Sequence, residues 1–320
     1  MKTIQKFMTA AVSAMAISAF GGQVAADYPE KPVTIVVPFA AGGGTDITTR
    51  AMQEQMGKAL GGDVVVKNTA GAGGTIGVAS VARATANGYT IGMAPVGPLT
   101  TQPHLRKLPY ASDSFEYVCL AYSAPSAIAV RKDSKFNTLK ELIDYARTNP
   151  GKLNFAVQAI GSIPHVAGLA FAEAAGIDMA YLPVNGDGPA LKALLDGSAD
   201  IFIPHISFLT KNKEQIKSLA VLQTERLSTA ADLPTAKEQG YDLDFPIWGG
   251  LVTPADTPAD VVGKLDGACK TAIESDGFQA HMKKLGQPSA YMNSKDFNAF
   301  VMKQYEQNKR LLQKAGLKPQ

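Results

Sequence analysis

The stretch VTIVVPFAAGGGTDITTR, residues 33–50, contains the change from strand to helix that decides the fold. Its first five residues are apolar or β-branched, which is typical of a buried strand. Three glycines follow at 42–44, and a helical pattern comes after them. Glycine has no Cβ and tolerates positive φ, so a glycine-rich turn before a helix lets backbone N–H groups approach an anion. The stretch therefore predicts an α/β unit with an anion-binding turn at the carboxyl end of its strand.

The same order of strand, glycine-rich loop and helix recurs further along the chain. The later loops are NTAGAGGTIG at 68–77, AIGSIPH at 159–165 and PVNGDGPA at 183–190. This alternation predicts a mostly parallel sheet with helices on both faces. Ligands of such sheets bind beyond the carboxyl ends of the strands, where helix N-termini favour negative charge. We therefore expect these loops to surround one site for an anion.

The length and the order of the pattern predict two lobes. A chain of 320 residues is long enough for two domains. The α/β pattern restarts near residue 124, and a long C-terminal helix has no strand partner of its own. We therefore predict a discontinuous first lobe, residues 27–123 plus 228–320, and an inserted second lobe, residues 124–227. Two α/β lobes joined by crossing strands form a cleft, and hinge closure around a ligand is usual for that shape.

The first 26 residues have the composition of a secretory signal peptide. Lys2 and Lys6 precede the apolar run FMTAAVSAMAISAF, and small residues lead up to Asp27. This arrangement predicts cleavage near Ala26 and export of the mature protein. The alternative, a retained membrane anchor, is disfavoured because the run is short for a membrane span.

Charge and cysteine content exclude other classes. The formal net charge of +3 falls to +1 when Lys2 and Lys6 are set aside, and nucleic-acid binding is disfavoured without a basic face. Cys119 and Cys269 belong to no CxxC or metal-binding spacing. In an exported protein they are either a disulfide or two buried thiols, and the sequence does not decide between these.

Motifs of common enzymes and nucleotide-binding proteins are missing. The chain has no GxGxxG, GxxxxGK[ST], GxSxG or HExxH pattern. A dispersed set of Ser162, His165 and Asp187 is interpreted as hydrogen bonding in the cleft rather than as a catalytic triad. Asp46 is interpreted as an N-cap. We therefore expect no catalytic residue, no cofactor and no metal, with a periplasmic hydrolase or lyase on the same scaffold as the alternative.

Six segments together resemble a known family over nearly all of the mature chain. They are YPEKPVTIVVPFAAGGGTDITTR, VKNTAGAGGTIGVASVARATANGYT, PHVAGLAF, GPALKALLDGSAD, SLAVLQTERLSTAADLPTAKEQGY and IWGGLVTPADTPADVV. In this order they resemble the periplasmic solute-binding proteins of tripartite tricarboxylate transporters. The resemblance implies a two-lobe periplasmic-binding-protein architecture, type II-like, with a central cleft and hinge. It implies a periplasmic receptor, expected to be monomeric, that passes a small carboxylate to a membrane permease; a sensor for a signalling partner stays open.

The resemblance also implies the ligand-binding residues. In the family the first glycine loop holds a ligand carboxylate through backbone N–H groups and ordered water, and the second loop and the end of the third strand complete that wall. Here those positions are Phe39, Ala40, Ala41, Gly43, Gly44, Thr45, Asp46, Gly71, Ala72, Gly73, Val96 and Gly97. In the second lobe the expected residues are Ile160, Gly161, Ser162, His165, Asn185 and His205.

The second lobe departs from the family pattern at two places. Residues 157–160, VQAI, precede Gly161 where Ser and Gly are frequent, and residues 183–186, PVNG, stand where Pro-Tyr-Lys-Gly is usual. A cation and a hydroxyl are therefore missing near the distal pocket. We hypothesise that the distal half of the ligand is less anionic, or more apolar or aromatic, than a tricarboxylate. Ile160 and Val184 would be its walls, and Asn185 and His205 its polar contacts.

Overall fold

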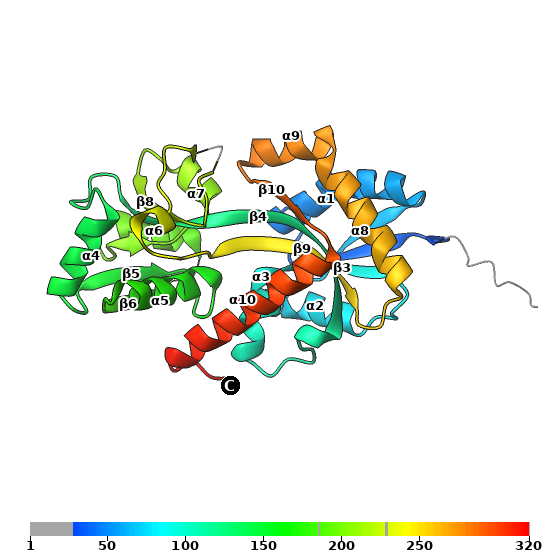
Figure 1. The fold of residues 1–320 in the computed structure, drawn as a ribbon, viewed down its shortest axis with the longest axis horizontal. Coiled ribbons are helices and arrows are strands. Elements are labelled where there is room, and N and C mark those ends of the chain that lie inside the picture. Colours follow the sequence, from blue (N-terminus) through cyan, green and yellow to red (C-terminus); the bar gives the residue numbers. More distant parts are fainter. Residues whose placement is uncertain (1–27, 185, 228–229, 320) are drawn as a thin grey trace, which may run out of the picture.

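The computed structural model describes residues 28–184, 186–227 and 230–319. It consists of two α/β lobes that lie side by side along the longest axis of the molecule (Figure 1). Strands β4, Phe115–Arg131, and β9, Pro246–Pro254, run between the lobes as an antiparallel pair. The predicted signal peptide, the predicted ligand contact Asn185 and the predicted lobe boundary at 228 lie outside the described residues, and the remaining lobe boundaries stay a prediction.

The first lobe is built on a sheet with the strand order β2-β1-β3-β9-β4, and β10 pairs with β4. The first three strands are parallel, as the alternating pattern predicts, and β9 is antiparallel to β3. These strands are β1 Val33–Val37, β2 Val64–Asn68, β3 Thr90–Pro95 and β10 Ser289–Met292. The helices are α1 Gly44–Leu60, α2 Thr75–Ala82, α3 Val96–Thr100, α8 Ala259–Glu274, α9 Asp276–Leu285 and α10 Ser294–Lys314, with 3₁₀ turns at Ala72–Gly74, Gln102–His104 and Ser112–Ser114.

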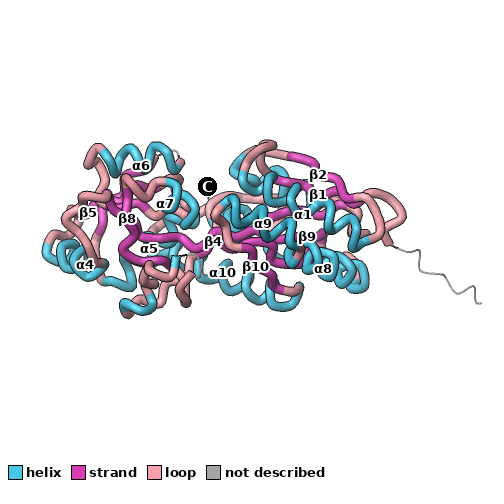
Figure 2. Tube along the Cα trace, turned by 90° about the horizontal axis from the view of Figure 1, so that it is seen from above, coloured by secondary structure: helices cyan, strands magenta, loops and turns pink. Residues whose placement is uncertain are grey.

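The second lobe contains three short parallel strands, and β4 and β8 complete its sheet. The strands are β5 Leu153–Val157, β6 Met179–Pro183, β7 Ile201–Phe202 and β8 Ile216–Leu222. The helices are α4 Leu139–Thr148, α5 Ile163–Ala175, α6 Asp187–Leu195 and α7 Ile206–Lys211, with a 3₁₀ turn at Lys237–Gln239. In the view of Figure 2, β4 runs from this lobe towards the first.

The apolar core forms three clusters that hold the helices against the sheets. One lies under α1, α8 and α9 in the first lobe, and another lies under α6 and α7 in the second. The largest spans both lobes and includes Trp248, whose buried ring packs edge-on against Phe297 and Phe300 of α10. Helix α10 therefore packs back on the first lobe beside the crossing strands. No helix in the described ranges combines the length and the apolar character needed to span a membrane.

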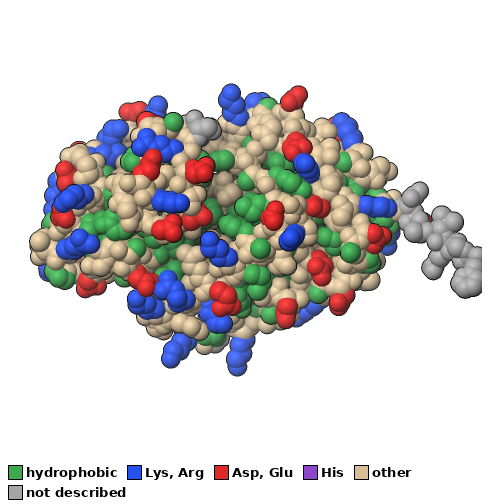
Figure 3. Space-filling model, in the orientation of Figure 1, with side chains coloured by type: hydrophobic (Ala, Val, Ile, Leu, Met, Phe, Trp, Pro, Cys, Tyr) green, Lys and Arg blue, Asp and Glu red, His purple; other side chains and the backbone are tan. Residues whose placement is uncertain are grey.

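An interlobe cavity of about 530 Å³ lies between α7 of the second lobe and α9 of the first. Figure 3 shows a hollow between the lobes on this face, where positive and negative side chains are mixed over the surface. The lining side chains are largely apolar and include Ile206, Leu227, Met282 and Pro288, with Lys283 and Gln287 among the polar ones. The two lobes are therefore incompletely packed against each other on this side.

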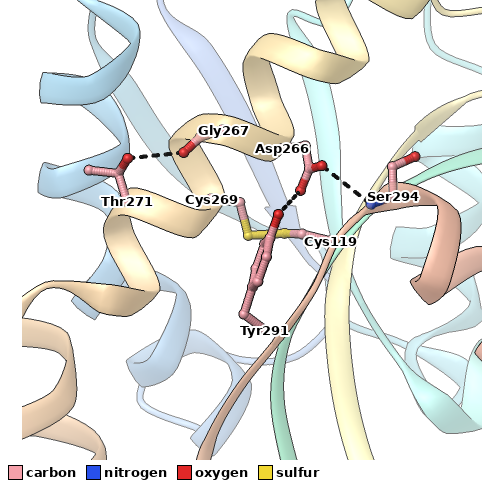
Figure 4. Close-up of a disulfide and its surroundings, with 7 residues drawn as sticks. All are labelled: Cys119, Asp266, Gly267, Cys269, Thr271, Tyr291 and Ser294. Atoms are coloured by element: carbon pink, nitrogen blue, oxygen red, sulfur yellow. Dashed lines mark hydrogen bonds between the residues drawn. A yellow bond between two sulfur atoms is a disulfide. The ribbon is translucent and has the colours of Figure 1, made fainter.

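Cys119 of β4 and Cys269 of α8 form a disulfide within the first lobe, which answers the question that the sequence left open (Figure 4). Their Cα atoms are 6.6 Å apart although 150 residues separate them in the chain. Close to the disulfide, the hydroxyl of Tyr291 on β10 donates a hydrogen bond to Asp266 of α8 at 2.8 Å. These links fix α8 to the sheet, and α8 in turn packs on α1.

Candidate functional site

Loop 38–46 leads from β1 into α1 and presents backbone donors that side chains do not cap. The N-cap of α1 is Gly43, in extended backbone geometry, and no side chain bonds to the first turn as a cap. Gly42 has a φ of +81°, which only glycine adopts without strain. The first N–H groups of a helix have no partner within the helix, so the donors of Gly44 and Thr45 are available to an anion.

Asp46 is not the N-cap that we predicted, because α1 begins at Gly44 and places Asp46 inside the first turn. Its buried carboxylate accepts the N–H of Gly42 at 2.8 Å, Nε of Arg50 at 3.0 Å and Nδ2 of Asn68 at 2.9 Å. Nδ2 of Asn68 also donates to the carbonyl of Phe39 at 3.0 Å. Burial raises the pKa of Asp46, but the hydrogen bonds from Arg50, Gly42 and Asn68 outweigh it and hold this pKa below its usual value. Asp46 therefore holds both ends of the loop in place.

The second glycine loop and the start of α3 lie against the first loop. A Cβ on Gly74 would be 2.9 Å from Cγ of Pro98 and 3.2 Å from Cζ of Phe39, so this close approach requires glycine. Gly71 and Gly73 both have positive φ, as does Ala72 between them, with a φ of 46°. Helices α2 and α3 also begin without a side-chain cap. The structure thus brings together the positions predicted for this wall, including Gly97 and the buried Val96 at the start of α3.

Both edges of the candidate site are anchored on β4. Oγ1 of Thr45 lies 3.4 Å from the hydroxyl of Tyr122, whose pKa is raised by burial. From the second lobe, His205 forms an isolated bridge with Ser126. At 3.3 Å per residue, these two anchor points on β4 are roughly 13 Å apart. Sequence reasoning did not find Tyr122, because a tyrosine in a buried strand has no local signal of a site.

Ser162 and His165 are engaged in the structure of loop 159–165. Ser162 is the N-cap of α5 and accepts the N–H of His165 at 3.4 Å, while Nδ1 of His165 accepts the N–H of Gly161 at 3.0 Å. The His165 ring is buried against Tyr181, and burial lowers its pKa to about 4. Asp187 lies beside His205 instead. The dispersed set of Ser162, His165 and Asp187 is therefore not assembled as a triad.

Loop 159–165 also touches the first lobe. Gly161 has a φ of +75°, and a Cβ there would lie 2.0 Å from Cδ1 of Leu105. Ile160 next to it is 47% exposed, and Val184 is half-buried. Both residues proposed as apolar walls are thus at least partly accessible to solvent.

His205, Asp187 and Gln158 come together at the far edge from three different loops. His205 is the N-cap of α7, and its Nε2 lies 3.6 Å from Oδ2 of Asp187. Nε2 of Gln158 lies 3.4 Å from Oδ1 of Asp187 and donates to the carbonyl of Ile203 at 2.8 Å. Sequence reasoning proposed His205 but missed Gln158, and considered Asp187 only for a triad. Within residues 28–184, 186–227 and 230–319, no three His, Cys, Asp or Glu side chains are arranged to hold a metal ion.

Two α/β lobes joined by crossing strands, with glycine loops at the strand ends, define a protein of the periplasmic-binding class. Residues 48–317 match the model of the tripartite tricarboxylate transporter family receptor, and the chain belongs to this family of solute-binding receptors.

Solved structures of three proteins illustrate what the chain is similar to. A TctC solute-binding protein from Polaromonas, without ligand, has a TM-score of 0.83 and 27% identity over 90% of this chain and 99% of its own. MatC from Rhodopseudomonas palustris, with bound malate, has a TM-score of 0.70 and 29% identity over 89% of this chain and 100% of its own. A further protein from R. palustris, with adipate, has a TM-score of 0.74 and 26% identity over 92% of this chain and 100% of its own.

Proposed function

We propose that this chain is a periplasmic receptor that binds a small carboxylate between its lobes and delivers it to the permease subunits of its transporter. The observation that carries the proposal is the uncapped first turn of α1, held in place by Asp46. A carboxylate at this position accepts charge-assisted hydrogen bonds from backbone N–H groups and is favoured by the helix dipole. The carboxylate of Asp46 is paired with Arg50 and nearly inaccessible, so it opposes such a ligand little.

The distance between the two edges suits a small ligand. The anchor points of Thr45 and His205 on β4 are roughly 13 Å apart, measured along the strand. Malate and adipate, which are bound by two similar proteins, are carboxylates of four and six carbons. We infer that ligands of about this length join the two edges and that their binding closes the hinge.

We further propose that the protein is a monomer without catalytic activity, exported by its N-terminal segment. Ser162 and His165, the polar pair available for hydrolysis, are used to cap α5 and to hold loop 159–165. Incubation with a labelled carboxylate tests this point, because a receptor returns the ligand unchanged whereas a hydrolase or lyase returns a product.

The backbone donors of α1 are tested by the substitution Gly44→Pro. Proline is tolerated at the first position of a helix, and the extended geometry of Gly43 suits a residue before proline. The variant removes one N–H donor, which should weaken carboxylate binding by about 10- to 100-fold in calorimetry. The matched control is Ala259→Pro, which makes the same change at the first position of α8.

Two outcomes would contradict the proposal. One is that Gly44→Pro binds the carboxylate as tightly as the wild type and the Ala259→Pro control do. The other is that no small carboxylate binds to the wild-type protein after unfolding and refolding to remove ligand retained from expression. Analogues in which every carboxylate is converted to an amide or ester should bind far more weakly, because they carry no charge for the helix N-terminus.

A further inference from the structure

The far edge of the candidate site presents an acidic side chain with no cation beside it. Asp187 stands in the first turn of α6, and its side chain is 35% exposed. Among the described residues, the side chain that comes within ion-pair distance of it is His205, and no lysine or arginine does so. The edge of the first lobe is the reverse, because the carboxylate of Asp46 is buried and paired with Arg50.

The hydrogen bonds of His205 determine which ring nitrogen carries the hydrogen. Nδ1 accepts the N–H of Phe208 at 3.3 Å and lies 2.7 Å from the hydroxyl of Ser207. A nitrogen that accepts a backbone N–H cannot carry its own hydrogen, so the hydrogen is on Nε2, the atom that faces Asp187 at 3.6 Å. In this arrangement the ring donates a hydrogen bond towards Asp187. Asp187 is therefore paired with a hydrogen-bond donor on a histidine and, among the described residues, with no lysine or arginine.

Gln158 holds Asp187 in position and adds a further acceptor. Its amide orientation is determined, because Nε2 must donate to the carbonyl of Ile203 at 2.8 Å. The same nitrogen lies 3.4 Å from Oδ1 of Asp187, and the Gln158 carbonyl accepts the N–H of Gly186 at 2.9 Å. The side-chain oxygen is buried and has no donor among the described residues. An acidic group and an unsatisfied buried acceptor thus lie together at the edge.

We infer that the far end of the ligand carries a hydrogen-bond donor, an N–H or O–H group, and that Asp187 is the residue that excludes a second carboxylate. This inference rests on the proposed function, because the first carboxylate must be held at α1. A carboxylate near Asp187 meets a like charge in a partly buried site, and such a juxtaposition is costly. A protonated amine or an amide meets an acceptor there instead. Asp187 therefore sets ligand class by excluding the wrong charge as well as by binding the right group.

The test compares ligands of equal length that differ only at the far end. Calorimetry is run with succinate, succinamate and 4-aminobutanoate, and with adipate, adipamate and 6-aminohexanoate. In the wild type, the tightest donor-terminated ligand of a set should bind at least about tenfold more tightly than the dicarboxylate of that set. In the nearly isosteric variant Asp187→Asn, the dicarboxylate should bind more tightly than it does to the wild type. The preference for the donor-terminated ligand should shrink to about threefold or less.

Controls separate the charge of Asp187 from other effects. Asp196→Asn removes the same charge from the far end of α6 and should leave the preference of the wild type unchanged. Thermal unfolding of each variant shows whether it is folded, and Asp187→Ser replaces Asp187→Asn if the latter is not.

The outcomes for this inference and for the proposed function are distinct. If dicarboxylates bind the wild type better than their donor-terminated counterparts, or if Asp187→Asn keeps the wild-type preference, the inference is wrong and the proposed function stands. If no ligand of either set binds to the wild type or to Asp187→Asn, the proposed carboxylate site is wrong, and the inference fails with it.

Discussion

The two edges of the candidate site are built on the same plan, a strand followed by a loop and a helix, but they use opposite chemistry. At the first lobe, α1, α2 and α3 begin without side-chain caps, so no side chain caps the N–H groups of their first turns. At the second lobe, Ser162 and His205 each accept one N–H group in the first turn of α5 and α7, whereas α6 begins without a side-chain cap. The side chains that are left there, Asp187 and Gln158, are acceptors. We therefore expect the edges to differ in the charge that they accept, because Asp187 places an acidic side chain at the uncapped start of α6, whereas the acidic side chain of the first edge, Asp46, is buried and paired with Arg50.

The edges also differ in the charge that they bury. The first lobe buries a charged carboxylate, Asp46, compensated by Arg50 and by N–H donors. The second buries a neutral imidazole, His165, with no charged partner within ion-pair distance among the described residues. Both buried groups are compatible with a stable fold at neutral pH, but acid affects them in different pH ranges.

The largest effect is expected from the disulfide, because it braces the first lobe only. Replacing both Cys119 and Cys269 by serine releases a closed loop of about 150 residues and should cost about 4 kcal/mol of unfolding free energy in urea titrations. Since α8 packs on α1, amide exchange should quicken at the start of α1 more than at the start of α5. Equal acceleration at both edges would show that the two lobes are stabilised as one unit.

Acid should destabilise the second edge before the first. The folded-state pKa of His165, about 4, lies below its ordinary value of 6.5, so the neutral ring contributes fully above pH 6.5. That contribution is lost as the pH falls from 6.5 towards 4 and should amount to roughly 3 kcal/mol. The lowered pKa of Asp46 acts only as the pH falls below its ordinary value of 3.8.

The variant His165→Asn tests this order. It keeps an acceptor for the N–H of Gly161 but does not titrate. Denaturant unfolding at pH 7 and at pH 4.5 should show a smaller loss of stability in the variant than in the wild type. The same loss in both proteins would mean that another group carries the pH dependence.

A smaller effect is expected where the edges meet. Gly161→Ala places a methyl group 2.0 Å from Leu105 at a φ of +75°, and both strain and overlap should cost about 2 kcal/mol. Gly176→Ala is the matched control. Gly176 is the C-cap of α5, the helix that follows loop 159–165, and it has a φ of +61° with open space at its Cβ. The control should lose about 1 kcal/mol and keep its ligand affinity. If the two variants behave alike, the contact with Leu105 has no role in positioning loop 159–165.

The fold was largely predictable, because it depends on local patterns, whereas the ligand contacts of the first edge stay a prediction. Apolar strands and glycine loops are visible in the sequence, and the parallel pairing of β1, β2 and β3 follows from them. The predicted role of Asp46 was wrong, because the N-cap is Gly43, three residues earlier, where no side chain marks the cap. The pairing of Cys119 with Cys269 and the cluster of Gln158, Asp187 and His205 could not be predicted. These groups are distant in sequence, and only the packing of sheets and helices brings them together.

The crossing strands have a consequence for how such receptors diversify. The chain enters the second lobe along β4 and returns along β9, and Ser123 and Ala124 pair directly with Trp248 and Ile247. The two strands that connect the lobes are therefore neighbours in one ribbon. A segment with adjoining ends is exchangeable as a cassette while the remaining sheet keeps its register. We therefore expect that recombination of a single contiguous gene segment can change the second lobe while the first three strands of the first lobe keep their pairing.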